Sequence, residues 1–360
     1  MKKNKLLIAI GTAMLIGVVS ILAYKAQNKS TLSDVIHIGS IAPLTGGGAV
    51  FGKYNQEATD IATDLLSKEF GLPIKLHVED SKSTAKDAIN AYMHIKNKES
   101  DVRIICSEMT SVACAVYPFV SRDSAFLISI AVADDLRGKQ DTILVYPGAA
   151  QIYACLLSFL GNENFRGKVS VFCINDDFGR SIAERFLTSE IKSRFEVLEF
   201  DAHTDIKSLV AKSSGECACV CGYGTQLLAI IRELQTSKRI KYIVSSPEFA
   251  FPEYYNAVDS SDEKLYYMEF GKYDAVLKIM GERLKRAPNL IDFLIFGEYL
   301  TVFSAVQQLN EAGLPITGHN MVEKVRGQTF SFRGYEISFD ETCKAKFDLV
   351  VVKAKTLLSR

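Results

Sequence analysis

A carboxylate in apolar surroundings is the first chemically suggestive feature of the sequence. Glu248 lies in the stretch SSPEFAF, residues 245–251, directly after a strand-like run, and its neighbours include Phe249, Phe251 and Pro252. An ionised carboxyl group among apolar side chains is costly unless a cation pairs with it. A ligand ammonium would supply that cation, whereas an exposed loop would remove the cost. The stretch by itself leaves both interpretations open.

Two hydroxyl side chains stand where a helix is expected to begin. Thr110 and Ser111, in CSEMTSVACAV, lie between a predicted strand that ends at Cys106 and a helical segment, which is the position of an N-cap hydroxyl. Backbone N–H groups at a helix start bind carboxylates, with a helix-dipole contribution of about 0.3 to 1 kcal/mol. The pair therefore indicates either a carboxylate site or a plain structural cap.

Cysteine and histidine, the usual ligands of transition metals, form no recognisable metal motif. Cys217, Cys219 and Cys221 alternate by two in ECACVCGYG, which puts all three on one face of a buried strand. Metal knuckles usually need a turn between such ligands. The histidines are scattered without an HExxH motif, and we expect surface or structural roles for all five: His37, His77, His94, His203 and His319. We predict no metal and no cofactor.

Enzymatic interpretations find little support in the motifs. The glycines of LTGGGAVFG follow a predicted strand, but they do not form GxGxxG and no Walker lysine with Ser or Thr follows them. There is no GxSxG, and no histidine lies beside a candidate nucleophile in a recognisable motif. We therefore expect a binding protein without catalytic residues, not an enzyme.

Two α/β units in series are predicted to position these residues. From residue 34 onward, short β-rich runs alternate with helical stretches, which is the rhythm of βαβ units in a parallel sheet. The first unit has predicted strands at 35–42, 73–79, 102–106 and 125–129. The second has predicted strands at 168–175, 196–200, 217–222 and 241–245, with helices at 179–194, 205–213 and 225–236.

A third block breaks this rhythm. It begins with a strand at 264–270 and continues with helices at 273–286 and 291–312 and strands near 334–339 and 347–353. This order suggests that late segments return to complete the earlier domains. We predict one lobe from residues 34–147 plus 271–328 and a second from 148–270 plus 329–360.

Composition is that of a folded globular chain. The sequence has 360 residues, of which 48% are hydrophobic, enough for about two domains. The 42 basic residues equal the 42 acidic residues in number, so there is no excess of positive charge to hold phosphate backbones. We expect no nucleic-acid partner, and we expect a monomer.

The N-terminus is an export signal or a membrane anchor within residues 1–30. MKKNK supplies three lysines, and the uncharged run Leu6–Tyr24 follows before polarity returns. The run is long for a signal peptide and barely long enough to span a bilayer, which needs about 20 residues. In either case the remaining chain is expected to act in the periplasm or elsewhere outside the cytoplasm, and residues 6–24 could tether it to the inner membrane.

The chain from about residue 34 to 353 resembles the type 1 periplasmic solute-binding proteins of ABC importers, most closely those for leucine, isoleucine and valine. IHIGSIAPLTGGGAVFGKYNQEA resembles the first strand, loop and helix of that family. NDDFGRSIAERF is similar to its D-x-Y-G-x-x-x-A-x-x-F segment, with Phe178 where tyrosine is usual. SSPEFA is similar to its G-P-E-G turn, and FRGYEISFDETCKAKFDLVVVKA to its closing segment. The resemblance implies two Rossmann-like three-layer α/β lobes with parallel-rich sheets, joined by hinge strands.

The same resemblance implies a ligand-binding site. The glutamate matching Glu248 receives the ligand's amino group, and a serine matching Thr110, next to Ser111, holds its carboxylate. The backbone near Ala131 and Ala133 faces the ligand's main-chain groups; threonine is common where Ala133 stands, so one hydrogen bond is missing or replaced by water. This departure weighs against a standard α-amino acid. Aromatic walls are implied by three residues, each of which could instead be ordinary core: Phe51, Phe178 and Tyr223.

Two functions follow from these expectations. The first is a solute-binding protein that captures an amino-acid-like ligand between its lobes and delivers it to an ABC permease. The alternative is a membrane-anchored receptor or regulator of the same fold that signals to a partner protein. The long apolar run at residues 6–24 favours the second, because a free binding protein would have a cleaved signal.

Overall fold

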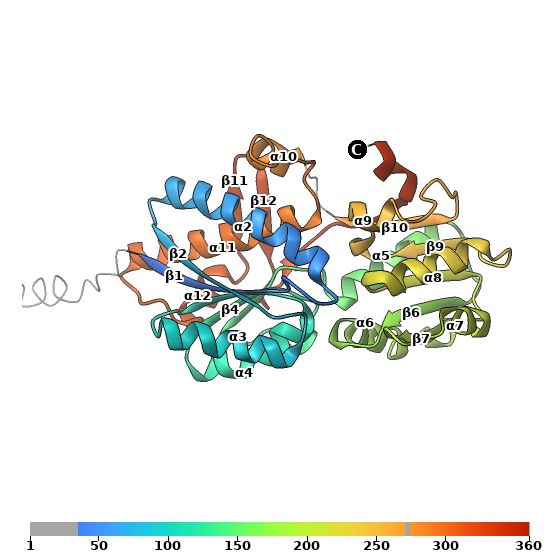
Figure 1. Ribbon diagram of the computed structural model, residues 1–360, viewed down its shortest axis with the longest axis horizontal. Coiled ribbons are helices and arrows are strands. Elements are labelled where there is room, and N and C mark those ends of the chain that lie inside the picture. Colours follow the sequence, from blue (N-terminus) through green and yellow to red (C-terminus); the bar gives the residue numbers. More distant parts are fainter. Residues whose placement is uncertain (1–34, 271–273, 360) are drawn as a thin grey trace, which may run out of the picture.

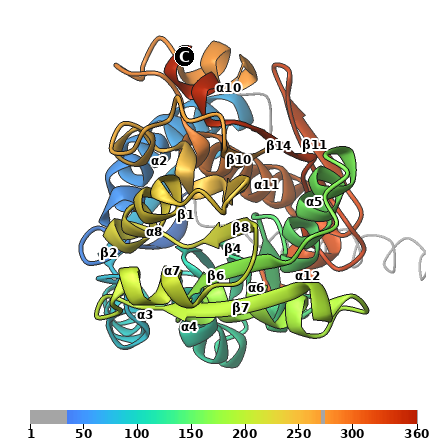
Figure 2. The same cartoon turned by 90° about the vertical axis from the view of Figure 1, so that its right-hand side faces the viewer.

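The computed structural model describes residues 35–270 and 274–359 (Figure 1). The predicted signal or anchor at residues 6–24 lies outside the described residues. Figure 1 shows two lobes side by side, each with a sheet between helices. Figure 2 views the molecule from the end of the second lobe, with the first lobe behind it.

A five-stranded parallel sheet forms the centre of the first lobe. Its strands are β1 (Ile36–Ala42), β2 (Ile74–Asp80), β3 (Ile104–Glu108), β4 (Phe126–Ile130) and β5 (Thr142–Leu144), in the order β2-β1-β3-β4-β5. Four of these five strands were predicted to within two residues at each end, and only β5 was not. Because all five are parallel, their carboxyl ends meet at one edge of the sheet.

Side chains that alternate along these strands divide the core of the first lobe between two faces. Ile104 and Cys106 of β3 pack in one apolar cluster, whereas Ile105 packs in the other. Figure 1 shows α2 (Ala49–Phe70) and α11 (Leu290–Ala312) above the sheet and α3 (Ala85–Lys98) and α4 (Thr110–Arg122) below it. Helix α12 (Gly318–Val325) also contacts α11.

Helix α11 is the one described helix that is long and apolar enough to cross a membrane. It is nevertheless almost wholly buried between α2 and the sheet, as expected for the core helix of a folded lobe. Its N-cap Asn289 accepts hydrogen bonds from the backbone N–H groups of Ile291 and Asp292.

A six-stranded sheet forms the second lobe. Its strands are β6 (Val169–Ile174), β7 (Phe195–Phe200), β8 (Cys217–Cys221), β9 (Tyr242–Ser245), β10 (Leu265–Phe270) and β14 (Leu349–Lys353), in the order β14-β10-β9-β8-β6-β7. All neighbours are parallel except β14, which is antiparallel to β10. The helices are α5 (Ala149–Asn162), α6 (Asp177–Leu187), α7 (Ile206–Lys212), α8 (Gly224–Thr236) and the short α9 (Pro252–Tyr255).

The chain changes lobe three times, as the order of elements predicted. It leaves the first lobe between β5 and α5, and it returns after β10 through α10 (Asp274–Met280) to α11. A small antiparallel sheet of β11 (Thr329–Phe332), β12 (Tyr335–Phe339) and β13 (Ala345–Lys346) precedes the last passage to β14. Strands β11 and β12 contact α11, whereas the sequence had assigned 329–360 to the second lobe; the exact domain boundaries stay a prediction.

Two predicted helices are wrong in extent. The helix expected over 273–286 is observed only as Asp274–Met280. The helix expected over 179–194 begins at Asp177 and ends at Leu187. The backbone N–H of Thr188 still donates to the Glu184 carbonyl, but that of Ser189 donates to Phe186, only three residues back, so the last turn tightens and the helix ends. Residues Lys192–Arg194 form a separate 3-10 turn before β7.

Candidate ligand-binding site between the lobes

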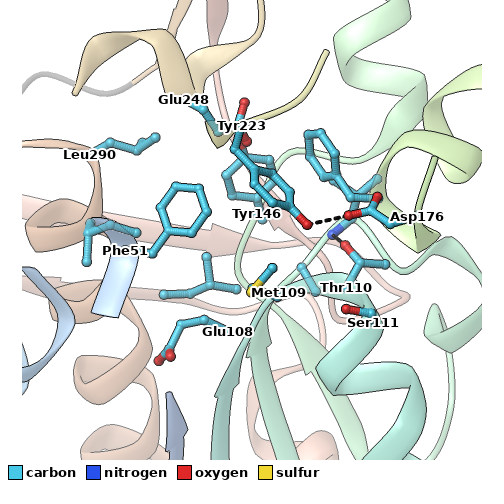
Figure 3. Close-up of a pocket in the computed structure, with 15 residues that line it drawn as sticks. Phe51, Glu108, Met109, Thr110, Ser111, Tyr146, Asp176, Tyr223, Glu248 and Leu290 are labelled. Atoms are coloured by element: carbon cyan, nitrogen blue, oxygen red, sulfur yellow. Dashed lines mark hydrogen bonds between the residues drawn. The ribbon is translucent and has the colours of Figure 1, made fainter. Parts of the chain in front are cut away.

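A cavity lies where the carboxyl ends of the two parallel sheets face each other (Figure 3). Residues of the first lobe, the second lobe and the connecting segments all line it. Its volume is about 50 Å³, room for roughly three or four water molecules. The cavity is therefore small, and a larger ligand requires side chains or lobes to move apart.

Seven of the eight site residues predicted from the sequence line this one cavity. They come from six separate segments of the chain: Phe51, Thr110, Ser111, Ala131, Phe178, Tyr223 and Glu248. Ala133 does not belong to them. It lines a second hollow with Asp134 and Asp135, because a 3-10 turn at Asp134–Leu136 carries the chain away from the cavity directly after Val132.

Glu248 is buried in the cavity wall, with an exposed fraction of 5%. Its 3-10 turn, Pro247–Ala250, directly follows β9 and so presents it at the carboxyl edge of the second sheet. The Tyr146 hydroxyl donates to Oε1 at 2.5 Å, whereas Oε2 has no hydrogen-bond partner. Burial raises the pKa of this carboxyl group to about 7, against the opposite effect of the Ser246 and Tyr146 hydroxyls. The group thus has an acceptor to offer a ligand.

Two further acids line the cavity, and each accepts a hydrogen bond within the protein, although Oε2 of Glu108 has no partner. Asp176 caps helix α6 by accepting the N–H of Gly179 at 2.9 Å, and its other oxygen accepts the Tyr223 hydroxyl. Glu108 accepts from the Asn55 amide, and Figure 3 shows its carboxyl group turned away from Tyr223 and Glu248. Burial raises the pKa of both acids, that of Glu108 to about 8. Glu248 is left as the acid best placed to receive a ligand cation.

The start of α4 forms the opposite wall, and its geometry corrects the expected N-cap. Met109 is the N-cap, with a φ of 72° and no capping side chain. Thr110 is already the first helical residue, and its Oγ1 accepts the backbone N–H of Val132 at 3.2 Å instead of capping the helix. The first-turn N–H groups thus receive no side-chain cap, and the Thr110 hydroxyl keeps its own proton to donate. Both suit an incoming carboxylate.

Aromatic rings close the cavity from both lobes. Phe51 of α2 contacts Tyr223 and Phe251 of the second lobe, with ring centroids 5.6 and 5.4 Å apart. The ring centroids of Phe178 of α6 and Tyr223 are 6.3 Å apart. Such edge contacts add about 0.5–1.5 kcal/mol beyond area burial. These rings give the cavity apolar walls, and the contacts of Phe51 join the two lobes beside it.

Comparison with known proteins adds evidence at the level of the fold. No protein-family model matches the sequence, and no curated protein matches it. Among solved structures, the leucine-binding protein LivK of Thermotoga maritima superposes with a TM-score of 0.75 at 18% identity, over 88% of this chain and 94% of that one. LivJ, the branched-chain amino acid transporter substrate-binding protein of Streptococcus pneumoniae, was solved with isoleucine and gives a TM-score of 0.72 at 16% identity, over 89% and 99% of the two chains. The protein has the type 1 periplasmic binding protein fold.

A longer protein shares this periplasmic binding protein fold. The extracellular ligand binding receptor from Desulfohalobium retbaense gives a TM-score of 0.73 at 16% identity, over 88% of this chain but only 58% of its own length. This chain therefore spans little more than half of that receptor. The predicted fold class is confirmed: two α/β lobes with parallel-rich sheets.

Several cavity residues of this binding-protein fold were missed by sequence reasoning. They line the cavity from the ends of strands or from the connections between the lobes: Glu108, Met109, Tyr146, Asp176, Leu290 and Ile291. A signal was present for three of them. Glu108 ends β3, Tyr146 follows β5 and Asp176 follows β6, and ligands of parallel sheets bind outside the carboxyl ends of the strands. Leu290 and Ile291 carry no such signal, because only the return of α11 places them there.

Proposed function

We propose that the protein is an extracytoplasmic solute-binding protein that captures a small, amino-acid-like ligand between its lobes and delivers it to an ABC permease. The single observation that carries the proposal is the pairing across one cavity of a buried carboxyl group, Glu248, with an uncapped helix start at Thr110. The first suits an ammonium group and the second a carboxylate.

The ligand's charges would leave water when the lobes close, so each needs a fixed partner. Glu248 Oε2, buried and without a partner, would accept from the ammonium group. The N–H groups of Thr110 and Ser111 and the Thr110 hydroxyl would donate to the carboxylate. Hydrogen bonds to charged groups contribute about 1.5–3 kcal/mol each.

The remainder of the ligand is expected to be apolar. Most of the cavity wall consists of hydrophobic side chains, among them Phe51, Met109, Ile130, Phe178 and Leu290. No Lys, Arg or His of the described chain lines the cavity. A ligand with an extra acidic group would find no counter-ion there, which favours a neutral or cationic body.

Capture rather than turnover is the mechanism. The ligand bridges the lobes and makes contacts that exist only when they are closed, so it shifts the population toward the closed form. A differential affinity of about 5.5 kcal/mol moves such an equilibrium from 1:99 to 99:1, less than the roughly 8 kcal/mol of a micromolar complex. A small molecule can therefore drive closure, and the closed outer surface would be read by the permease.

The test is a thermal-shift and calorimetric screen of the purified full-length protein. The panel contains apolar amino acids, the corresponding amines without a carboxylate, and the corresponding carboxylic acids without an amine. We expect amino acids to stabilise the protein most. If amines stabilise the protein as strongly as amino acids do, Glu248 binds the ammonium group but the start of α4 does not bind a carboxylate. If no compound with an amino group raises the melting temperature, the proposal is overturned.

A second candidate is a membrane-anchored receptor of the same fold. The uncharged run at 6–24 favours it, and one structural neighbour is described as a ligand binding receptor. N-terminal sequencing of the mature protein separates the two functions, since a chain that begins after residue 24 is released and one that retains residues 6–24 stays anchored.

A further inference from the structure

Three side chains distant in the sequence bring metal-binding atoms together on the first lobe. His37 lies on β1, His77 on β2, and Glu99 directly after α3. The parallel pairing of β1 with β2 sets Gly39 opposite His77, so His37 and His77 are near neighbours on adjacent strands. All three residues are half-buried, and one candidate ligand atom from each lies within 4.8 Å of the others.

Two of the three separations between these atoms are short. His37 Nδ1 is 3.1 Å from His77 Nε2 and also 3.1 Å from Glu99 Oε2. The two ring centroids are farther apart, 5.2 Å, so the rings approach one another through their nitrogen edges. Ligand atoms about 2.0–2.1 Å from a tetrahedral zinc ion lie about 3.3 Å from one another. The two separations from His37 Nδ1 are close to that spacing.

Protons alone satisfy this arrangement poorly. A neutral imidazole carries one N–H, and His37 Nδ1 faces both His77 Nε2, which donates or accepts according to its tautomer, and the Glu99 carboxylate, which accepts. If Nδ1 carries the hydrogen, that hydrogen cannot point well at both partners, and if it does not, the contact with Glu99 has no proton. A cation placed among the three atoms would accept a lone pair from each of them.

The chemistry of the three side chains also suits zinc. Two imidazoles and one carboxylate form a donor set that zinc uses with water in the fourth position.

We propose that His37, His77 and Glu99 form a binding site for a divalent transition-metal ion of the zinc type. The site lies near the amino end of β1 and the C-terminal end of α3, whereas the ligand cavity lies at the carboxyl ends of the strands. It is thus separate from the cavity, and the proposal does not depend on the proposed solute-binding function. A bound ion would fasten β1, β2 and the end of α3 together.

The test is isothermal titration of the full-length protein, purified without a histidine tag, with zinc chloride. We expect saturable binding of one ion, weakened at least tenfold by His77→Gln and by His37→Asn. The matched control is His94→Gln, because His94 makes an exposed contact with Glu79 at 2.7 Å but has no second histidine beside it. This control is expected to bind zinc as the parent does, and all three variants are expected to retain binding of any solute in the cavity.

An independent readout uses the unmodified protein and so does not require the variants to fold. The sequence contains five histidines, and their imidazole proton resonances can be followed during the zinc titration. Two rings, those of His37 and His77, are expected to shift together at one equivalent. Absence of saturable binding, an equal effect of His94→Gln, or shifts of other rings alone would overturn the proposal.

Discussion

At the scale of residues, the ionisation of Glu248 links the cavity to stability. Its pKa in the folded protein is about 7, above the ordinary value of 4.5, so the unfolded chain loses this proton at lower pH than the folded one. The contribution of Glu248 to stability is therefore fully present below pH 4.5 and is lost as pH rises toward 7. Glu108 and Glu298, whose pKa values are also raised by burial, act in the same direction.

The unfolding free energy of the parent protein should fall between pH 5 and pH 8 as Glu248 ionises. We predict that this fall is smaller by about 1–3 kcal/mol in Glu248→Gln. Urea unfolding at several pH values measures this. Glu196→Gln is the matched control. Hydrogen bonds from Ser214 and Ser170 lower the pKa of Glu196 despite burial, so this substitution should change the pH dependence of stability only at lower pH. An unchanged pH profile in Glu248→Gln would show that this carboxyl group is not held in an apolar site.

The same carboxyl group should report on the ligand. Near pH 6 Glu248 is largely protonated in the free protein, and a bound ammonium group would favour its ionised form. We predict that binding at pH 6 releases a proton, seen as a calorimetric enthalpy that depends on the ionisation enthalpy of the buffer. The release should vanish at pH 8.5 and in Glu248→Gln. Uptake of a proton at pH 6 would contradict the ammonium assignment.

The Thr110 hydroxyl offers a second test at this scale. Its oxygen accepts the Val132 N–H, so its proton can be donated to a ligand carboxylate. We predict that Thr110→Val weakens binding by about tenfold or more, since a hydrogen bond to a charged group contributes about 1.5–3 kcal/mol. Thr110→Ser keeps the hydroxyl and should bind nearly as the parent does. Equal affinities of the two variants, measured by titration calorimetry, would remove Thr110 from the site.

At the scale of elements, α2 connects the lobes through a polar contact beside the aromatic one. The Tyr54 hydroxyl donates to Glu253 of α9 at 2.9 Å, and the Lys53 ammonium lies 2.8 Å from the same carboxylate. The Tyr54 ring also stacks on Phe251, with centroids 5.6 Å apart. Tyr54 is buried, whereas the Lys53 side chain is 66% exposed.

We predict that Tyr54→Phe lowers ligand affinity about two- to tenfold, because it removes a closed-state hydrogen bond worth about 0.5–1.5 kcal/mol and keeps the ring. Lys53→Met should have a smaller effect, since an exposed ion pair contributes about 0–1 kcal/mol. Small-angle scattering with and without ligand would show whether the affinity change accompanies a more open molecule. A larger loss of affinity in Lys53→Met than in Tyr54→Phe would mean that the exposed ion pair controls closure.

At the scale of the whole molecule, the cysteines are all thiols in the described chain. Seven of the eight are buried, and only Cys114 is partly exposed. Burial raises the pKa of the Cys114 thiol to about 11, so little reactive thiolate is present at pH 7. The alternating cysteines of β8 lie inside the second lobe, which confirms the buried strand predicted from their spacing.

We predict that a thiol reagent reacts slowly with the native protein and rapidly with eight groups in denaturant. A reducing agent should leave the melting temperature unchanged, because no disulfide contributes to stability. Fewer than eight thiols in the denatured protein, together with a lower melting temperature after reduction, would contradict this arrangement.

The sequence by itself determined the local structure and its order. Alternating and 3.6-residue apolar patterns predicted most strands and helices, because burial of one face depends on residues close together in the chain. The motif around Glu248 showed an acid with apolar neighbours adjacent in sequence, but it left open whether that acid was buried or exposed.

Only the tertiary structure decided which residues meet. Tyr146 reaches Glu248 across 102 positions of sequence, and Leu290 joins the cavity because α11 returns to the first lobe. His37 and His77, which we expected to have only surface or structural roles, are brought together by the pairing of β1 with β2. Strand order, lobe crossings and the turn after Val132 depend on packing among distant segments, and no local pattern encodes that packing.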